Sequence, residues 1–383
     1  MSLSGIRSKL GAPASSIFST MSALAQQHQA INLSQGFPDY PIDPLLISYA
    51  QEAMLQGHNQ YAPMAGAAVL RRAIASKIRG CMNVETDEER EITVTPGATA
   101  ALHASLGAFT GPGDEVIVLE PAYDSYIPAI RSYGAVPVSV RLEGPDFCID
   151  AEKIRANIGP HTRMLILNNP HNPTATLASR EDLDRLAGVL RDTPVLLLSD
   201  EVYEHLVYDE VRHASVLQHP ELRARSIAVF SFGKVFHATG WKIGYAVAPP
   251  ELSLALRQVY QYMCFSAHTP SQYALARYLE DPSRYTGLPA FFQAKRDFFA
   301  ALLRQSRFRA LPSRGTYFML ADYGGISDAP DTEFVQQLLV QHKVAAIPLS
   351  PFYGQAPSQT LIRFCFAKQE TTLQQAAERL QSV

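Results

Sequence analysis

The sequence predicts an α/β fold, with a large domain built on a mostly parallel sheet and a smaller α+β domain after it. Three observations lead to this prediction. From residue 91 onwards, short apolar runs rich in β-branched residues are bounded by turn residues, as in strands buried on both faces. Helical patterns lie between several of these runs. Past residue 275, helical stretches become longer and two strand-like runs interrupt them.

The elements of the large domain follow from these patterns. Strands are predicted at residues 92–95, 116–119, 164–167, 195–198, 227–230 and 243–247. Helices are predicted where apolar residues recur at helical spacing, at 102, 106 and 109 and again at 183, 186 and 190. Strands that alternate with helices are typical of a parallel sheet.

The two ends of the chain have a different pattern. Residues 13–30 are predicted to form an N-terminal arm and helix. After residue 275 we predict helices around 298–303 and 334–339, strands at 344–347 and 361–366, and a last helix from about 371 to 380. We therefore expect a large domain over residues 45–275, and a small domain formed by residues 276–383 together with residues 1–44.

Composition excludes several classes of function. The net charge is −3, so we expect no nucleic-acid or membrane partner. No apolar run approaches the roughly 18 residues of a spanning helix, and no secretory signal is recognisable, so a cytoplasmic location is expected. The four cysteines lie far apart and there is no His-Glu-x-x-His, so we predict no metal site and four ordinary buried thiols, at Cys81, Cys148, Cys264 and Cys365.

Polar residues follow four of the predicted strands. They are Gly97-Ala98-Thr99 at the start of a helix, Asn168 to Pro173, Asp200, and the segment from Ser231 to Lys242 that contains Lys234. Because ligands of open α/β sheets gather at the carboxyl ends of the strands, these residues are candidates for one site.

Each group suits one part of a single ligand. Backbone N–H groups at Gly97-Ala98-Thr99, with the Ser231 hydroxyl and the Lys242 amine, would form a site for phosphate. Asp200, at a buried strand end, needs a cationic partner. Lys234 has few charged neighbours in sequence, as expected of an imine-forming lysine. A phosphate, a protonated ring nitrogen and an aldehyde on lysine together describe pyridoxal phosphate.

Taken singly, these residues have simpler explanations: Asp200 as a helix cap, Lys234 as a surface lysine, and the asparagine segment as a polar turn. Their conjunction carries the prediction. Other phosphate motifs fit worse, because no G-x-G-x-x-G opens a first βαβ unit and Lys234 lacks the glycine and hydroxyl neighbours of a P-loop.

The chain resembles the class I and II aminotransferases, which are pyridoxal-phosphate enzymes of fold type I with a mostly parallel seven-stranded sheet. The resemblance rests on Ser231 to Gly244, the segment of the attachment lysine, on Asn168 to Thr174 and on Ser199 to Tyr203. Within the family, the chain is most similar to methionine and aromatic aminotransferases and more distantly to the kynurenine/glutamine group.

The resemblance implies a role for each candidate residue. Lys234 would carry the cofactor and transfer the substrate proton, Asp200 would pair with the ring nitrogen, and Tyr203 with Asn172 would bind the phenolic oxygen. The other cofactor contacts would be Asn168, Tyr123 stacked on the ring, and, at the phosphate, Gly97, Ala98, Thr99, Ser231 and Lys242. Lys242 stands where many members have arginine, and Ala175 where glycine is usual.

The resemblance also implies the substrate contacts and the assembly. Arg363 would bind the carboxylate of an L-amino acid or 2-oxo acid, helped by Asn172, Tyr123 and the backbone of Gly36. The family forms homodimers with sites at the interface, so Tyr61 would reach the phosphate in the neighbouring subunit.

The predicted reaction is amino transfer from a large neutral amino acid to a 2-oxo acid by a ping-pong mechanism. Candidates for the side-chain pocket would suit methionine, aromatic residues or leucine, although core or interface packing is an alternative for some of them; they are Tyr123, Phe18, Ile17, Phe352, Tyr353 and Phe37. No second arginine for a dicarboxylate is recognisable. Two other functions stay open: a β-lyase acting on sulfur amino acids and a kynurenine/glutamine-type aminotransferase. A cofactor-sensing regulator and an α/β binding protein without cofactor are further, non-catalytic alternatives.

Overall fold

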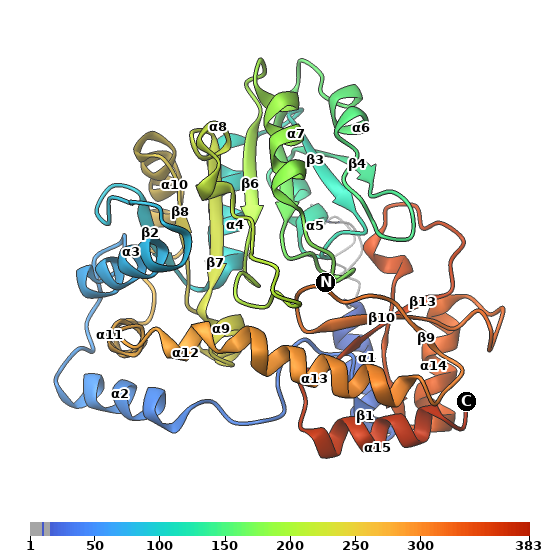
Figure 1. Cartoon of the computed structure of the whole chain (residues 1–383). Helices are drawn as coiled ribbons and strands as arrows, with labels where there is room; N and C mark the ends of the chain where they lie inside the picture. The colour runs from blue at the N-terminus through green and yellow to red at the C-terminus, as the bar shows by residue number, and fades with distance from the viewer. Residues whose placement is uncertain (1–9, 11–15) are drawn as a thin grey trace, which may run out of the picture.

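A seven-stranded sheet forms the centre of the protein (Figure 1). The computed structural model describes residue 10 and residues 16–383. The strands of the sheet, in spatial order, are β2 Ile92–Thr95, β8 Gly244–Val247, β7 Ser226–Ser231, β6 Leu196–Asp200, β5 Thr162–Asn168, β3 Glu115–Glu120 and β4 Val136–Arg141. Only β8 runs in the direction opposite to the other six strands of this sheet, which confirms the predicted α/β fold with a mostly parallel sheet.

Helices cover both faces of this sheet because its strands are apolar on both. In β5, Leu165 and Leu167 belong to one core cluster, whereas Met164 and Ile166 belong to the other. The first cluster includes apolar residues of α3 Ala68–Met82 and α7 Arg180–Leu190, and the second includes those of α4 Gly97–Phe109, α5 Tyr126–Ser132 and α10 Pro250–Met263. The continuous apolar runs in the sequence therefore result from burial on both sides.

The sequence analysis missed one strand of this sheet. Each of the six predicted runs forms a strand, but β4 at the sheet edge was not predicted. Most of its residues are exposed or half-buried, and Pro137 lies within it. An edge strand lacks the continuous apolar run that identifies a central strand, and it also tolerates proline.

A second sheet forms in the C-terminal part of the chain. Its order is β12 Ile347–Pro348, β13 Leu361–Cys365, β10 Phe318–Asp322 and β9 Arg309–Ala310. The strand predicted at 344–347 is in fact two short strands, because β11 Val344–Ala345 pairs instead with β1 Ile31–Asn32. Ala346 lies between the two strands and belongs to neither, so one apolar run contributes strands to two sheets.

Pairing of β1 with β11 places the N-terminal region beside the C-terminal one. Helix α1 Ile17–Gln27 precedes β1, as predicted, while residues 13–15 of the expected arm lie outside the described residues. The helices around the second sheet are α13 Leu288–Leu303 (orange in Figure 1), α14 Asp331–His342 and α15 Glu370–Leu380. The exact division at residues 44/45 and 275/276 stays a prediction.

The remaining helices are short or peripheral. They are α2 Pro44–Leu55, α6 Ala151–Ala156, α8 Pro220–Arg223, α9 Phe232–Val235, α11 Thr269–Tyr278, α12 Ser283–Thr286 and the 3-10 turns Val216–Gln218, Thr239–Trp241 and Ser350–Phe352. In the part of the chain that the structure describes, none of the helices combines the length and apolar character needed to cross a membrane.

The prediction of four buried thiols is wrong for three of them. Cys365 in β13 is buried, but Cys81, Cys148 and Cys264 are exposed. Cys81 lies on the exposed side of the last turn of α3, Cys148 in the turn before α6, and Cys264 at the end of α10. All four are free cysteines.

Gly244 is a packing constraint at the start of β8. A Cβ atom added there would lie 2.6 Å from the carbonyl oxygen of Phe230 and 2.7 Å from the backbone nitrogen of Ala98. We expect Gly244→Ala to lower the free energy of unfolding by about 1–3 kcal/mol, because backbone atoms cannot move aside. The urea midpoint of the cofactor-free protein measures the change.

Gly80, in the last turns of α3, provides the matched control. A Cβ atom there would meet nothing within 4 Å, so Gly80→Ala should raise stability by roughly 0.5–1 kcal/mol. Equal urea midpoints for Gly244→Ala and the wild type would contradict the packing argument.

Candidate active site

A cavity of about 400 Å³ lies where the carboxyl edge of the large sheet meets the C-terminal sheet. Strands β5, β6 and β7 end here at Asn168, Asp200 and Ser231. Arg363 comes from the middle of β13, and Gly36 from the segment after β1. All the residues predicted to bind the cofactor or the substrate carboxylate line this cavity except Tyr61.

One end of the cavity is built to hold an anion. Gly97, Ala98 and Thr99 line the cavity and form the first turn of α4. No side chain among the described residues caps this turn, so its N–H groups have no side-chain partner from the fold. Gly97 has a φ of +76°, and a Cβ atom there would lie 3.1 Å from Lys242 Nζ. The positive end of the helix dipole, its N–H groups and the Lys242 ammonium group are therefore close together at this end of the cavity. The Ser231 hydroxyl does not cap the helix that follows it, so it is also available to an anion.

The Asp200 carboxylate lies at the buried end of β6, with 4% of the residue exposed. Its Oδ2 accepts a hydrogen bond from the Tyr126 hydroxyl at 2.6 Å, and its Oδ1 accepts one from the Val202 N–H at 3.3 Å. Burial raises the pKa of Asp200 to about 6, although both hydrogen bonds act against this shift. Such a carboxylate is most stable beside a cation.

Lys234 brings an amine into the same cavity. Its Nζ donates to the carbonyl oxygen of Gly36 at 3.3 Å and lies 5.7 Å from the ring centres of Tyr203 and Tyr317. Burial lowers the pKa of Lys234 to about 8, and the Arg363 guanidinium acts in the same direction. A substantial fraction of this lysine is therefore a neutral amine near pH 8, the form that attacks an aldehyde.

A chain of hydrogen bonds links Asp200 to Arg363. Asn168 donates from its Nδ2 to the Asp200 carbonyl oxygen at 2.8 Å, and its Oδ1 accepts from the Asn172 N–H at 2.8 Å. The Asn172 side-chain oxygen accepts from Arg363 at 2.5 Å. The guanidinium of Arg363 lies 3.8 Å from the ring centre of Phe318, and its buried Nε has no hydrogen-bond partner among the described residues. Arg363 therefore keeps a donor available for a ligand.

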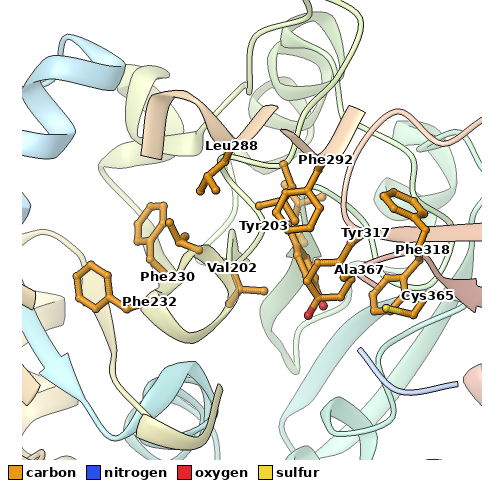
Figure 2. Close-up of a cluster of buried hydrophobic side chains, with 14 of the residues drawn as sticks. Val202, Tyr203, Phe230, Phe232, Leu288, Phe292, Tyr317, Phe318, Cys365 and Ala367 are labelled. Carbon is orange, nitrogen blue, oxygen red and sulfur yellow. The ribbon is translucent and has the colours of Figure 1, made fainter. Parts of the chain in front are cut away.

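Tyr203 lines the cavity and belongs to a cluster of buried side chains (Figure 2). Its ring packs edge-on against Tyr317, at 5.3 Å, and Phe318, at 5.9 Å. The Tyr317 hydroxyl donates to the carbonyl oxygen of Gly36 at 2.5 Å, so it fixes the same oxygen that Lys234 contacts.

Sequence reasoning missed Tyr126 and Tyr317. Tyr126 follows β3, and the carboxyl end of β3 lies on the side of the sheet where ligands are expected. A search of the residues after this strand could therefore have found it. Tyr317 precedes β10, an element that the sequence analysis did not identify, and no signal in the sequence pointed to it.

The predicted side-chain pocket is only partly confirmed. Phe18, Phe37 and Tyr123 line the cavity. Ile17, Phe352 and Tyr353 are not among the lining residues, and Phe352 is buried in the core with its ring edge-on to Phe18, at 5.9 Å.

Tyr61 lies outside the cavity of its own chain. It is 83% exposed and packs edge-on against Phe265, with 5.4 Å between ring centres. Its expected contact with a neighbouring subunit stays a prediction.

The residues present fit pyridoxal phosphate. The anion site suits the phosphate, the buried Asp200 carboxylate suits a protonated ring nitrogen, and Lys234 suits the aldehyde. The glycine at position 97 leaves space that any side chain would fill in front of Lys242. The fold and this site together define a pyridoxal-phosphate enzyme.

Comparisons with known proteins agree. The family model described as "Aminotransferase class I and II" matches residues 28–380. Methionine aminotransferase of Escherichia coli (strain K12) is 48% identical over 98% of both chains, and its crystal structure superimposes with a TM-score of 0.97 over 99% of both. N-succinyldiaminopimelate aminotransferase from Mycobacterium tuberculosis is 40% identical, with a TM-score of 0.94 over 99% of this chain and 100% of that one. Human kynurenine–oxoglutarate transaminase 1 is 33% identical over 93% of both chains.

The chain therefore belongs to the class I and II aminotransferase family. It has the fold-type I architecture of that family and is a transaminase that depends on pyridoxal phosphate.

Because the pKa of Asp200 is raised, we predict that the free energy of unfolding of the cofactor-free protein depends on pH. Between pH 3.8 and about 6 the folded state binds more protons at this site than the unfolded state, so stability falls as pH rises through this range. The total loss is on the order of 3 kcal/mol. We expect Asp200→Asn to be more stable than the wild type above pH 6, with the advantage disappearing towards pH 4.

Urea unfolding of the cofactor-free proteins at pH 4.5 and pH 7.5 measures this difference. Asp192→Asn, which removes an exposed carboxylate at the opposite end of the sheet, is the control and should show no such change. A gain for Asp200→Asn of equal size at both pH values would disprove the argument from ionisation.

Proposed function

We propose that this enzyme transfers the amino group of a large neutral L-amino acid, such as methionine or an aromatic amino acid, to a 2-oxo acid by a ping-pong mechanism. One observation carries the proposal: a single arginine, Arg363, lines the described part of the cavity, and its neighbours there include Phe18, Phe37 and Tyr123. One guanidinium suits one carboxylate, and aromatic rings suit an apolar side chain. The name of the 48% identical Escherichia coli protein, methionine aminotransferase, supports this choice of donor.

The cofactor contacts proposed for this chain follow the geometry of the cavity. Lys242, Ser231 and the first turn of α4 would hold the phosphate, and Tyr123 would cover one face of the ring. Asn172 and Tyr203 would bind its phenolic oxygen. Asp200 would hold a proton on the ring nitrogen, because its buried carboxylate is stabilised by a positive charge.

Pyridoxal phosphate, when bound, supplies a ring that accepts the electron pair released when the substrate loses its Cα proton. Lys234 would move that proton as a neutral amine, which its lowered pKa makes available. The Tyr203 and Tyr317 rings and the Gly36 carbonyl surround its Nζ and restrict where the amine can reach.

Arg363 would orient the substrate. Its guanidinium is fixed between Asn172 and the ring of Phe318, so a carboxylate bound to the remaining N–H groups takes a defined position. A substrate held at both its carboxylate and its amine can rotate little, so the direction of its Cα–H bond relative to Lys234 is restricted.

Two related functions are alternatives to this proposal. A β-lyase acting on sulfur amino acids would use the same lysine and carboxylate, and a kynurenine/glutamine-type aminotransferase would differ in its donor. Similarity to human kynurenine–oxoglutarate transaminase 1 favours the second of these. A cytoplasmic location, expected from the sequence, is part of the same proposal.

A donor panel with Lys234→Ala tests the function. The holoenzyme should convert methionine and phenylalanine to their 2-oxo acids only when a 2-oxo acid acceptor is present. Lys234→Ala should lower kcat by roughly 10²- to 10⁴-fold or more, because the proton-transfer group is lost. Product 2-oxo acids are measured by chromatography, and Lys153→Ala at an exposed site should keep the wild-type rate.

Release of pyruvate and ammonia from cysteine conjugates without an acceptor would instead identify a β-lyase. Strong activity with kynurenine or glutamine and none with methionine would identify the other alternative. Full activity of Lys234→Ala would disprove the assigned role of this residue.

We also propose that the enzyme is a homodimer with active sites at the interface. Tyr61 packs against Phe265, which is 43% exposed, and Tyr262, three residues before Phe265 in the chain, is 87% exposed. Large apolar side chains that are exposed and pack against one another are typical of a protein interface. Tyr61 would donate to the cofactor phosphate in the partner subunit.

Light scattering should therefore give about twice the 42.1 kDa mass of the chain. Tyr61→Phe should keep the dimer but weaken cofactor binding by roughly five- to tenfold, since one hydrogen bond to a charged group is lost. A monomer at micromolar concentration, or unchanged cofactor affinity in Tyr61→Phe, would contradict this part of the proposal.

A further inference from the structure

Five charged side chains line the described part of the active-site cavity. Three are cations, Lys234, Lys242 and Arg363, and two are carboxylates, Asp200 and Asp124. The proposed function uses the first four of these groups, for proton transfer, phosphate, substrate carboxylate and ring nitrogen. It gives Asp124 no task.

The fold does not use Asp124 either. The residue lies between Tyr123 and helix α5, whose N-cap is Ser125 and which has no side-chain cap. Within the described residues, the Asp124 carboxylate takes part in no ion pair, and its one hydrogen bond comes from its own backbone N–H. A half-buried carboxylate that neither caps a helix nor pairs with a cation costs free energy, so a structural role does not explain it.

Asp124 acts electrostatically on the substrate-binding part of the cavity. Asp124 and Arg363 line the same cavity, so their charges face a shared space. Burial raises the pKa of the Asp124 carboxyl, and the Arg363 guanidinium acts in the opposite direction. Asp124 also raises the pKa of the Tyr123 hydroxyl, as burial does. The carboxylate therefore adds negative potential where the substrate side chain would meet Tyr123.

We propose that Asp124 is a specificity-determining residue, whose carboxylate disfavours substrates with a second carboxylate and thereby selects neutral amino acids and their 2-oxo acids. This inference rests on the proposed function. Arg363 can bind one carboxylate, and among the described residues of the cavity a second carboxylate would meet Asp124 and no further arginine. Like charges brought together in a poorly solvated site repel strongly, whereas an apolar or amide side chain of the same length does not.

Glutamate and glutamine form the most direct comparison, because they have nearly the same shape and differ in one charge. The ratio of kcat/KM for glutamate to that for glutamine should rise about tenfold in the Asp124→Asn holoenzyme, as the repulsion is removed. Asp124→Glu keeps the charge and should keep the wild-type ratio. Asp192→Asn removes an exposed charge elsewhere and should also keep it.

Inhibitor binding gives a second readout that needs no turnover. Glutarate and pentanoate have five carbons each and carry two charges and one charge, respectively. Their dissociation constants are measured from the change in absorbance of the bound cofactor. Asp124→Asn should tighten glutarate binding about tenfold more than pentanoate binding. Asp124→Ser provides a second neutral variant if the asparagine variant does not fold.

The inference is overturned if the neutral variants change both members of each pair by the same factor. That result would mean that Asp124 only positions Arg363 or the loop around it. If the wild type transaminates no neutral amino acid, the proposed function fails instead, and the glutarate–pentanoate comparison still decides whether Asp124 repels a second carboxylate.

Discussion

Burial of the Asp200 carboxylate at the end of a central strand is the constraint on which the site depends. A carboxylate that is 4% exposed needs a positive partner, and the hydrogen bonds from Tyr126 and Val202 compensate only part of the lost hydration. The protein alone therefore holds this group in an unfavourable state. A cationic heterocycle opposite Asp200 would relieve that cost, so burial of this carboxylate favours binding of the cofactor.

The same principle applies to Lys234, whose amine is kept partly neutral by burial and by the nearby Arg363. The two groups have opposite charges and opposite pKa shifts, yet one cavity imposes both. Neither shift is a property of the residue itself. Both depend on the C-terminal sheet and the segment after β1, which cover the strand ends of the large sheet and exclude water from them.

Much of this arrangement could be predicted from the sequence, because central parallel strands have a recognisable pattern of continuous apolar residues. Continuous apolar runs marked six strands, and the residues after them contained Asn168, Asp200 and Ser231. The edge strand β4 left no such record, since most of its residues face solvent. The one apolar run that contributes strands to two sheets was also misjudged, because sequence alone does not show a change of partner at Ala346.

Site residues that act through other residues were the hardest to predict. Lys234 and Arg363 were identified through motifs, whereas Tyr126 and Tyr317 act by contacting Asp200 and Gly36. Such contacts join residues 74 and 281 positions apart in the chain, and no local pattern encodes them. They become visible only when the sheets are assembled.

The reversed direction of β8 has a consequence for how the two active-site lysines are coupled. Because β8 is antiparallel to β7, the last residue of β7 and the first residue of β8 are neighbours: Ser231 pairs with Gly244. A short excursion over residues 232–243 can therefore carry both Lys234 and Lys242, with no crossover helix between them. The proposed covalent attachment at Lys234 and the proposed phosphate contact at Lys242 thus lie on one short segment. An insertion or displacement within this segment would move both contacts with the coenzyme together.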